Sequence, residues 1–200
     1  MMKPRTLLTL TFPLMAASVA QAGEITTSKT ANLPFGLDSA HLHLLTNHIP
    51  IFVTFSGLVA LALALLWKND VAKRIALVLL VMGTVGGIAT YWLGQQAYKP
   101  VRGLADETGQ DWLDAHMERA EQVIWLFWMA ALSAVAALVM GWRKIKFSFL
   151  VTLLAGALGA GTLAASGWIA DAGGKIRHPE IRGNSHPPTD DASEQAPHEH

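Results

Sequence analysis

Histidine is the residue type in this sequence best suited to metal or haem chemistry, and none of the eight histidines interrupts a long apolar run. They are His41, His43, His48, His116, His178, His186, His198 and His200. Neutral imidazole is the commonest metal ligand, and two imidazoles can bind a haem iron from opposite faces. The chain has no cysteine, which excludes thiolate metal sites, disulfides and covalently attached c-type haem. Metal or haem binding would therefore rely on histidine, carboxylate, methionine or backbone groups.

Three histidines lie at the ends of apolar runs, where a helical bundle would bring them together. His48 immediately precedes the first run, His116 lies about two helical turns before the third, and His178 follows the fourth. We expect these three histidines to form a haem or transition-metal site. In its haem form, His48 and His116 would be the axial ligands, and Lys175 or Arg177 would pair with the propionates.

A simpler interpretation is that each histidine only makes ordinary hydrogen bonds at a wet interface. His41 and His43 are weaker candidates for a metal site, because the leucines around them indicate an amphipathic segment on the membrane surface. Depth is a difficulty for the haem form. His116 is predicted to lie above the bilayer surface and His48 at its boundary, whereas two axial ligands need matching levels.

The elements that must position these residues are four runs without any Asp, Glu, Lys, Arg or His. They cover residues 49–67, 75–93, 123–142 and 147–170. At about 1.5 Å per residue, about 20 residues cross a hydrocarbon core of about 30 Å. The polar remainder is too short to surround four helices that are apolar on all sides, so lipid must do so. The sequence predicts an all-α integral membrane protein with four transmembrane helices in an up-down bundle.

The amino-terminal apolar stretch, residues 7–20, has the character of a signal peptide. It is shorter than the other runs, follows two basic residues, and ends in Ala20-Gln21-Ala22, which fits a signal peptidase site. We predict that residues 1–22 are cleaved. The alternative is a retained fifth helix, which Pro13 and the short length disfavour.

Export of the new amino terminus agrees with the charges of the loops. The short loops, residues 68–74 and 143–146, are basic, as cytoplasmic loops usually are. The long middle loop, residues 94–122, holds six acids against three bases. We therefore predict a multi-pass protein of the bacterial inner membrane with both termini, and all the histidines, on the periplasmic side.

The predicted chain has four parts. They are the signal peptide (1–22), a periplasmic linker (23–40), the membrane domain (41–182) and a disordered histidine-containing tail (183–200). Within the second span, Gly83 and Gly87 have the spacing that lets two helix backbones approach closely. A flat cofactor against these glycines is the alternative interpretation.

Several classes of function are disfavoured. The spans contain no ionisable residue, whereas pumps and transporters usually place such groups inside the membrane. Net charge near zero gives no reason to expect nucleic acid as a partner. Since no nucleophile with its base, phosphate loop or dinucleotide fingerprint is present, neither a substrate nor a reaction is predicted.

Three motifs resemble a bacterial family of four-helix membrane proteins, the domain-of-unknown-function 2231 group. They are His-Leu-Leu-Thr-Asn-His-Ile-Pro-Ile at 43–51, the histidine followed by acids at 116–121, and Gly-Gly-Lys-Ile-Arg-His-Pro-Glu-Ile at 173–181. The resemblance covers about residues 40–182. It implies the four-helix fold and, because related domains accompany redox modules, a setting of electron transfer. Met117 and Arg119 interrupt the family's acids here, which makes a carboxylate-bridged dinuclear metal site less attractive.

These observations give three hypotheses of function. The leading one is a periplasm-facing membrane protein that binds haem b or a transition metal and passes electrons between a membrane carrier such as quinone and a periplasmic redox partner. The second keeps the histidines but handles copper or zinc without redox chemistry. The third is a structural or assembly subunit of a membrane complex, or an oligomer, without a cofactor.

Overall fold

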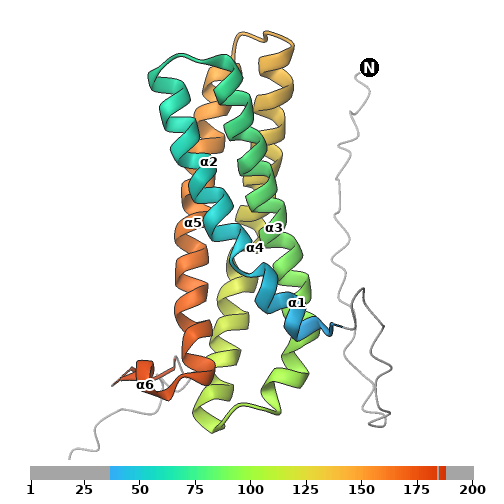
Figure 1. The fold of residues 1–200 in the computed structure, drawn as a ribbon, viewed down its shortest axis with the longest axis vertical. Coiled ribbons are helices and arrows are strands. Elements are labelled where there is room, and N and C mark those ends of the chain that lie inside the picture. Colours follow the sequence, from blue (N-terminus) through green and yellow to red (C-terminus); the bar gives the residue numbers. More distant parts are fainter. Residues whose placement is uncertain (1–36, 184, 188–200) are drawn as a thin grey trace, which may run out of the picture. The chain divides into compact units, whose positions relative to one another are not determined.

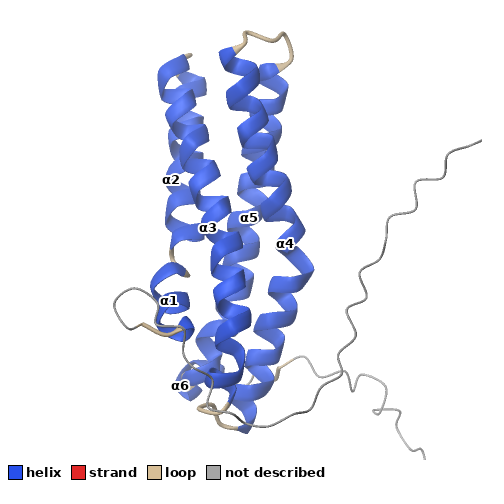
Figure 2. Ribbon diagram, turned by 90° about the vertical axis from the view of Figure 1, so that its right-hand side faces the viewer, coloured by secondary structure: helices blue, strands red, loops and turns tan. Residues whose placement is uncertain are grey.

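The computed structural model describes residues 37–183 and 185–187 of the chain, and the regular structure of these residues is entirely helical (Figure 2). The helices are α1 (Ser39–Thr46), α2 (Ile49–Leu66), α3 (Asp70–Arg102), α4 (Glu107–Trp142), α5 (Ser148–Arg177) and α6 (Pro179–Arg182) (Figure 1). The predicted signal peptide, nearly all of the linker and most of the predicted tail lie outside the described residues.

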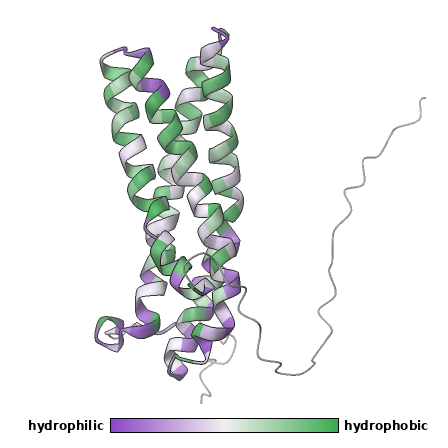
Figure 3. Ribbon diagram, turned by 45° about the vertical axis from the view of Figure 1, so that its right-hand side comes forward, coloured by the Kyte–Doolittle hydropathy of each residue, from purple (hydrophilic) through white to green (hydrophobic). Residues whose placement is uncertain are grey.

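Four helical segments are long and apolar enough to cross a membrane, as the sequence predicted. They are Ser39–Leu66, which joins α1 and α2, and the helices α3, α4 and α5. Hydrophobic residues follow the middle of these helices, and hydrophilic residues gather at the end that carries α1 and α6 (Figure 3). This pattern is compatible with a multi-pass membrane protein. At the α1 end, α3 and α4 extend well beyond the predicted spans, and His116 lies on such an extension.

Each of the four long helices packs along two others: α2 and α4 both pack against α3 and α5. The helices therefore surround a central core, to which α3 contributes Leu77 and Leu80, α2 Leu61 and α5 Ala155. We call the end with the two short connections, residues 67–74 and 141–148, the basic end. The other end, residues 39–48, 94–122, 168–183 and 185–187, is the histidine end (Figure 1).

A second core stabilises the histidine end, where α4 and α5 continue past the central core. Its buried members are Trp112, Leu113, Ala115, Ala172 and Ile176. Tyr98 and Val101 of α3 and Met117 of α4 pack against it. This end core holds the extensions of three helices together, and it gives the polar end of the molecule a rigid support.

Glycines let α2 and α3 pack at close range. A Cβ atom added at Gly83 would lie 2.7 Å from the backbone nitrogen of Thr54, and one at Gly57 would lie 3.0 Å from the backbone nitrogen of Leu80. Neither position can hold a larger residue unless the helix backbones separate. The predicted helix-packing role is confirmed for Gly83. The other member of the pair, Gly87, packs against the ring of Phe127 of α4.

Both connections at the basic end place a lysine in the left-handed region. Lys68 has φ 52° and Lys144 has φ 53°. In each case the next residue closes the preceding helix: Asn69 N–H donates to the carbonyl of Ala64, and Ile145 N–H donates to that of Met140, both at 2.9 Å. Such a position favours glycine, and a residue with a Cβ pays about 1–2 kcal/mol there.

We predict that Gly83→Ala lowers the thermal stability of the protein, whereas the matched variant Gly167→Ala does not. The added methyl group at position 83 meets the backbone of α2, and over-packing of this kind costs about 1–3 kcal/mol. At Gly167, no atom lies within 4 Å of the added Cβ. Thermal midpoints of the two variants and the native protein in one detergent test this. Equal midpoints for both variants would contradict the close approach.

Candidate functional site

The three histidines predicted to share a site are not gathered into one cluster. His48 is exposed in the turn between α1 and α2, where its ring stacks on Phe52 with a centroid distance of 6.1 Å. His178 is exposed at the end of α5, and its Nδ1 lies 2.8 Å from Glu180 Oε1. Within the described residues, no group of three or more histidine, aspartate or glutamate side chains could hold a metal ion.

The ring of His116 lies beside that of His43 instead, a residue that we predicted to be a weaker candidate for a metal site. The centroids of the two rings are 6.2 Å apart, and their planes are nearly perpendicular, at 89°. His43 comes from the short helix α1 and His116 from the extension of α4, and both side chains are partly buried. The pair is therefore the place where two imidazoles from distant parts of the chain meet.

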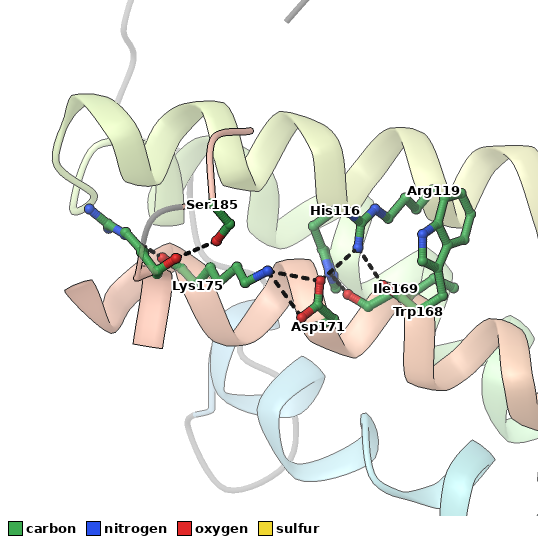
Figure 4. Close-up of polar contacts among 8 residues, drawn as sticks. His116, Arg119, Trp168, Ile169, Asp171, Lys175 and Ser185 are labelled. Atoms are coloured by element: carbon green, nitrogen blue, oxygen red, sulfur yellow. Dashed lines mark hydrogen bonds and ion pairs between the residues drawn. The ribbon is translucent and has the colours of Figure 1, made fainter. Parts of the chain in front are cut away.

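A backbone carbonyl orients each of the two rings. His43 Nδ1 lies 3.0 Å from the carbonyl oxygen of Thr90 in α3. His116 Nδ1 lies 2.9 Å from the carbonyl oxygen of Ile169 in α5, as Figure 4 shows. A carbonyl oxygen only accepts hydrogen bonds, so Nδ1 carries the proton in both rings. In the neutral imidazole this leaves the lone pair on Nε2. Metal-binding histidines are commonly oriented by this type of hydrogen bond.

Glycines on α3 and α5 make room for the two rings. A Cβ atom at Gly94 would lie 3.0 Å from His43 Cε1, and one at Gly173 would lie 2.9 Å from His116 Nδ1. Each glycine follows its carbonyl-bearing residue by four positions, one helical turn away on the same face. The arrangement thus occurs twice: His43 of α1 meets a carbonyl and a glycine of α3, and His116 of α4 meets a carbonyl and a glycine of α5.

The helix break before α2 places His43. Pro50 lacks an N–H and cannot donate to the carbonyl of Thr46, as a residue in a continuous helix would. The hydroxyl of Thr90 donates to that carbonyl instead, at 3.2 Å. At its other end, α1 is capped by Asp38, whose side chain accepts from His41 N–H at 2.9 Å. These contacts dock α1 on α3, with His43 turned toward Thr90.

Depth explains why the partner of His116 is His43 rather than His48. His43 bonds to Thr90 and His116 to Ile169, close to the exposed tryptophans Trp92 and Trp168. The two rings thus lie at matching levels. One signal in the sequence could have found this: His43 precedes the first predicted span by six residues, and His116 precedes the third by seven.

Lys175 and Arg177 are the two cationic residues predicted to pair with propionates. Of these, Lys175 already has partners. Its ammonium lies 3.1 Å from Asp171 and 4.4 Å from the centre of the Trp112 ring (Figure 4). Arg119 bonds to the same carboxylate at 3.2 Å and to the carbonyl oxygen of Trp168 at 2.6 Å. Arg177 is exposed at the end of α5. The network ties α4 to α5 directly beside His116.

A hollow lies between α3 and α4, and two of its lining residues, Gln95 and Met117, directly follow Gly94 and His116 in the sequence. Its lining residues are Gln95, Tyr98, Asp114, Met117, Glu118 and Glu121. The Tyr98 hydroxyl donates to Asp114 at 2.6 Å, and Arg102 bonds to the same carboxylate at 2.6 Å. Glu118 and Glu121 are exposed, so this hollow is acidic.

Comparison with known proteins identifies no relative: no family model matches the chain, and no curated protein or solved structure is significantly similar to it. The resemblance to the domain-of-unknown-function 2231 group therefore stays a prediction.

One ion pair connects the start of α4 with the segment after α5. Arg182 binds Asp106 through its two terminal nitrogens, Nη1 at 2.8 Å and Nη2 at 2.7 Å. Its Nε donates to the carbonyl of Lys175 at 2.8 Å. Asp106 also caps α4 by accepting from Gly109 N–H at 2.8 Å. The hydrogen bonds from Arg182, with the Gly109 bond next, lower the pKa of Asp106 from 3.8 to about 2.

We predict that the Asp106 carboxyl titrates near pH 2 and that Arg182→Gln moves its midpoint back toward 3.8. Because the pKa is lowered in the folded protein, the pair stabilises the fold above pH 3.8, and this contribution is lost as the pH falls from 3.8 to about 2. The carboxyl carbon shift of labelled protein in NMR measures the midpoint. An unchanged midpoint in Arg182→Gln would remove the guanidinium as its cause.

Proposed function

We propose that this chain is a membrane-embedded haem b or transition-metal protein whose ion lies between His43 and His116. The observation that carries the proposal is the separation of the rings. A metal–nitrogen bond is about 2 Å long and each nitrogen lies about 1 Å from its ring centre, so an ion in line between two rings needs centres about 6 Å apart. The centroids of His43 and His116 are 6.2 Å apart, and the Nδ1 atoms already face carbonyls, which leaves Nε2 for the ion.

Haem b is the form of the site that the donor set supports best. A structural zinc site needs four protein ligands, whereas a haem iron receives four nitrogens from the porphyrin and needs only two axial ligands. The pair supplies two. A haem held by His43 and His116 would supply one-electron redox chemistry. This supports electron transfer, with quinone or a periplasmic redox protein as partner.

The residues around the pair would orient it without touching the ion. The carbonyls of Thr90 and Ile169 hold the rings at fixed angles, and Gly94 and Gly173 leave space for them. The end core and the Arg119–Asp171 pair keep α4 and α5 together beside His116.

A second candidate function is the handling of copper without redox chemistry. Two imidazoles can bind a copper ion without a porphyrin, and Met117, next to His116, offers a thioether, which is a soft ligand that favours Cu(I). Met117 is partly buried against the end core beside the acidic hollow. The sequence hypothesis of an assembly subunit without a cofactor is the remaining alternative.

We predict that the purified protein, expressed with a haem supply, shows Soret and alpha bands that both His43→Ala and His116→Ala reduce at least tenfold, because each variant removes an axial ligand. Oxidised and dithionite-reduced absorption spectra measure the bands. The controls are His48→Ala and His41→Ala, exposed histidines next to the site, which should retain the bound haem.

Other results would change the assignment. Loss of the bands in His48→Ala but not in His43→Ala would restore the ligand pair predicted from the sequence. A colourless protein with one copper per chain, lost in both pair variants, would favour copper handling. A colourless protein without metal would leave the assembly subunit without a cofactor as the remaining hypothesis.

We further propose that the helices form an up-down-up-down bundle in the bacterial inner membrane, with the histidine end in the periplasm. The basic end supports this orientation, because cytoplasmic loops are usually rich in Lys and Arg. Residues 1–22 would be the cleaved signal peptide. The fold would be that of the domain-of-unknown-function 2231 group, in agreement with the resemblance of the histidine motifs.

We predict that a membrane-impermeant maleimide labels Ser185→Cys in intact spheroplasts and labels Lys146→Cys only after the membrane is opened. The chain has no cysteine, so each variant carries a single thiol. Ser185 and Lys146 are both exposed, at opposite ends of the bundle. The reverse pattern of labelling would invert the orientation and place the histidines in the cytoplasm.

A further inference from the structure

A second hollow lies at the basic end, between the start of α3 and the connection from α4 to α5. Its polar lining residues are Asp70, Lys73, Arg74, Lys144 and Ser148. Leu77 of α3 and Ala137 of α4 form part of its apolar lining. The hollow thus combines cationic groups with an apolar wall between two membrane-length helices.

The charge of this hollow is not balanced within the described residues. Lys73 pairs with Asp70 at 2.5 Å, and no ion pair engages Arg74 or Lys144 in the part of the chain that the structure describes. Three further cations lie on the same two connections, Lys68, Arg143 and Lys146, and Asp70 is the one acid there. The hollow therefore attracts anions.

Lys144 lines the hollow from a left-handed backbone position, which Lys68 also occupies without lining the hollow. The φ of Lys144, 53°, is one that glycine adopts without strain, yet the chain places a lysine there. A positive charge at the carboxyl-terminal end of α4 interacts favourably with the helix dipole, but this stabilisation is small for an exposed charge. The part of Lys144 in the proposal therefore rests on its place in the lining of the hollow.

Aromatic side chains place the hollow at the level of lipid headgroups. Trp67 and Trp142, at the ends of α2 and α4, are 73% and 78% exposed. Exposed tryptophans at the ends of membrane helices prefer the boundary between acyl chains and headgroups. An occupant of the hollow would therefore have its charge at the level of the phosphates and its apolar part along the helices.

We propose that this hollow binds the phosphate headgroup of an anionic phospholipid. Arg74 offers a planar pair of donors to the phosphate, Lys73 and Lys144 offer ammonium groups, and Ser148 offers a hydroxyl. Basic pockets between membrane helices bind anionic headgroups in this way. The proposal does not depend on the histidine pair, which lies at the other end of the helices.

Native mass spectrometry of the full-length protein, titrated with phosphatidylglycerol or phosphatidylcholine of equal chain length, tests the proposal. We expect one molecule of phosphatidylglycerol to bind at least tenfold more tightly than phosphatidylcholine. Arg74→Gln/Lys144→Gln should abolish this preference. The matched control, Arg143→Gln/Lys146→Gln, removes the same charge from residues that do not line the hollow and should keep it. Equal losses in both double variants would overturn the proposal in favour of diffuse attraction.

A further variant separates binding from folding. Lys144→Gly relieves the left-handed backbone and removes the ammonium, so it should raise the thermal midpoint in lipid-free detergent while it weakens phosphatidylglycerol binding several-fold. Unchanged lipid binding in this variant would contradict the role of Lys144. Glycerol phosphate and inorganic phosphate serve as competitors. If either displaces the lipid and binds as tightly, the site takes a small phosphate anion and the lipid proposal fails.

Discussion

The carbonyl of Thr46 has no donor within its own helix, and the position of His43 depends on how this group is satisfied. Pro50 removes the N–H that would have bonded to it. A bare carbonyl at the edge of an apolar region is costly, so α1 must bring Thr46 to a donor on another helix. Thr90 is that donor. The same residue's carbonyl accepts from His43, so one position on α3 fixes both the helix break and the ring.

The position of the His116 ring depends on a different set of interactions. His116 lies on a part of α4 beyond the central core, where an isolated helix would fray. The end core, the bidentate pair of Arg182 with Asp106 and the charges around Asp171 hold this extension against α5. The carbonyl of Ile169 consequently meets a ring whose backbone is already fixed. Polar interactions at this end thus act on the site by positioning helices.

The sequence predicted the helices better than the site, for physical reasons that particular residues illustrate. Runs free of charge indicate membrane-length helices, because lipid excludes ionised groups over a known thickness. The pairing of His43 with His116 depends on carbonyls, which every residue has and no sequence motif reports. Leucines beside His43 indicated a surface segment, although the helix docks on α3. Gly94 and Gly173 lie outside the predicted spans, so nothing marked them as spacers for rings.

His43 and His116 make the same kinds of contact with the helices beside them. Each histidine contacts a carbonyl and, four residues later in the sequence, a glycine, which lie on α3 for His43 and on α5 for His116. The connection before α3 and the connection before α5 each contain a lysine in the left-handed region. The two halves of the chain, α1–α3 and α4–α5, thus use the same kinds of contact to orient one histidine each. A ligand bound between the rings would therefore meet one imidazole, oriented in the same way, from each half of the chain.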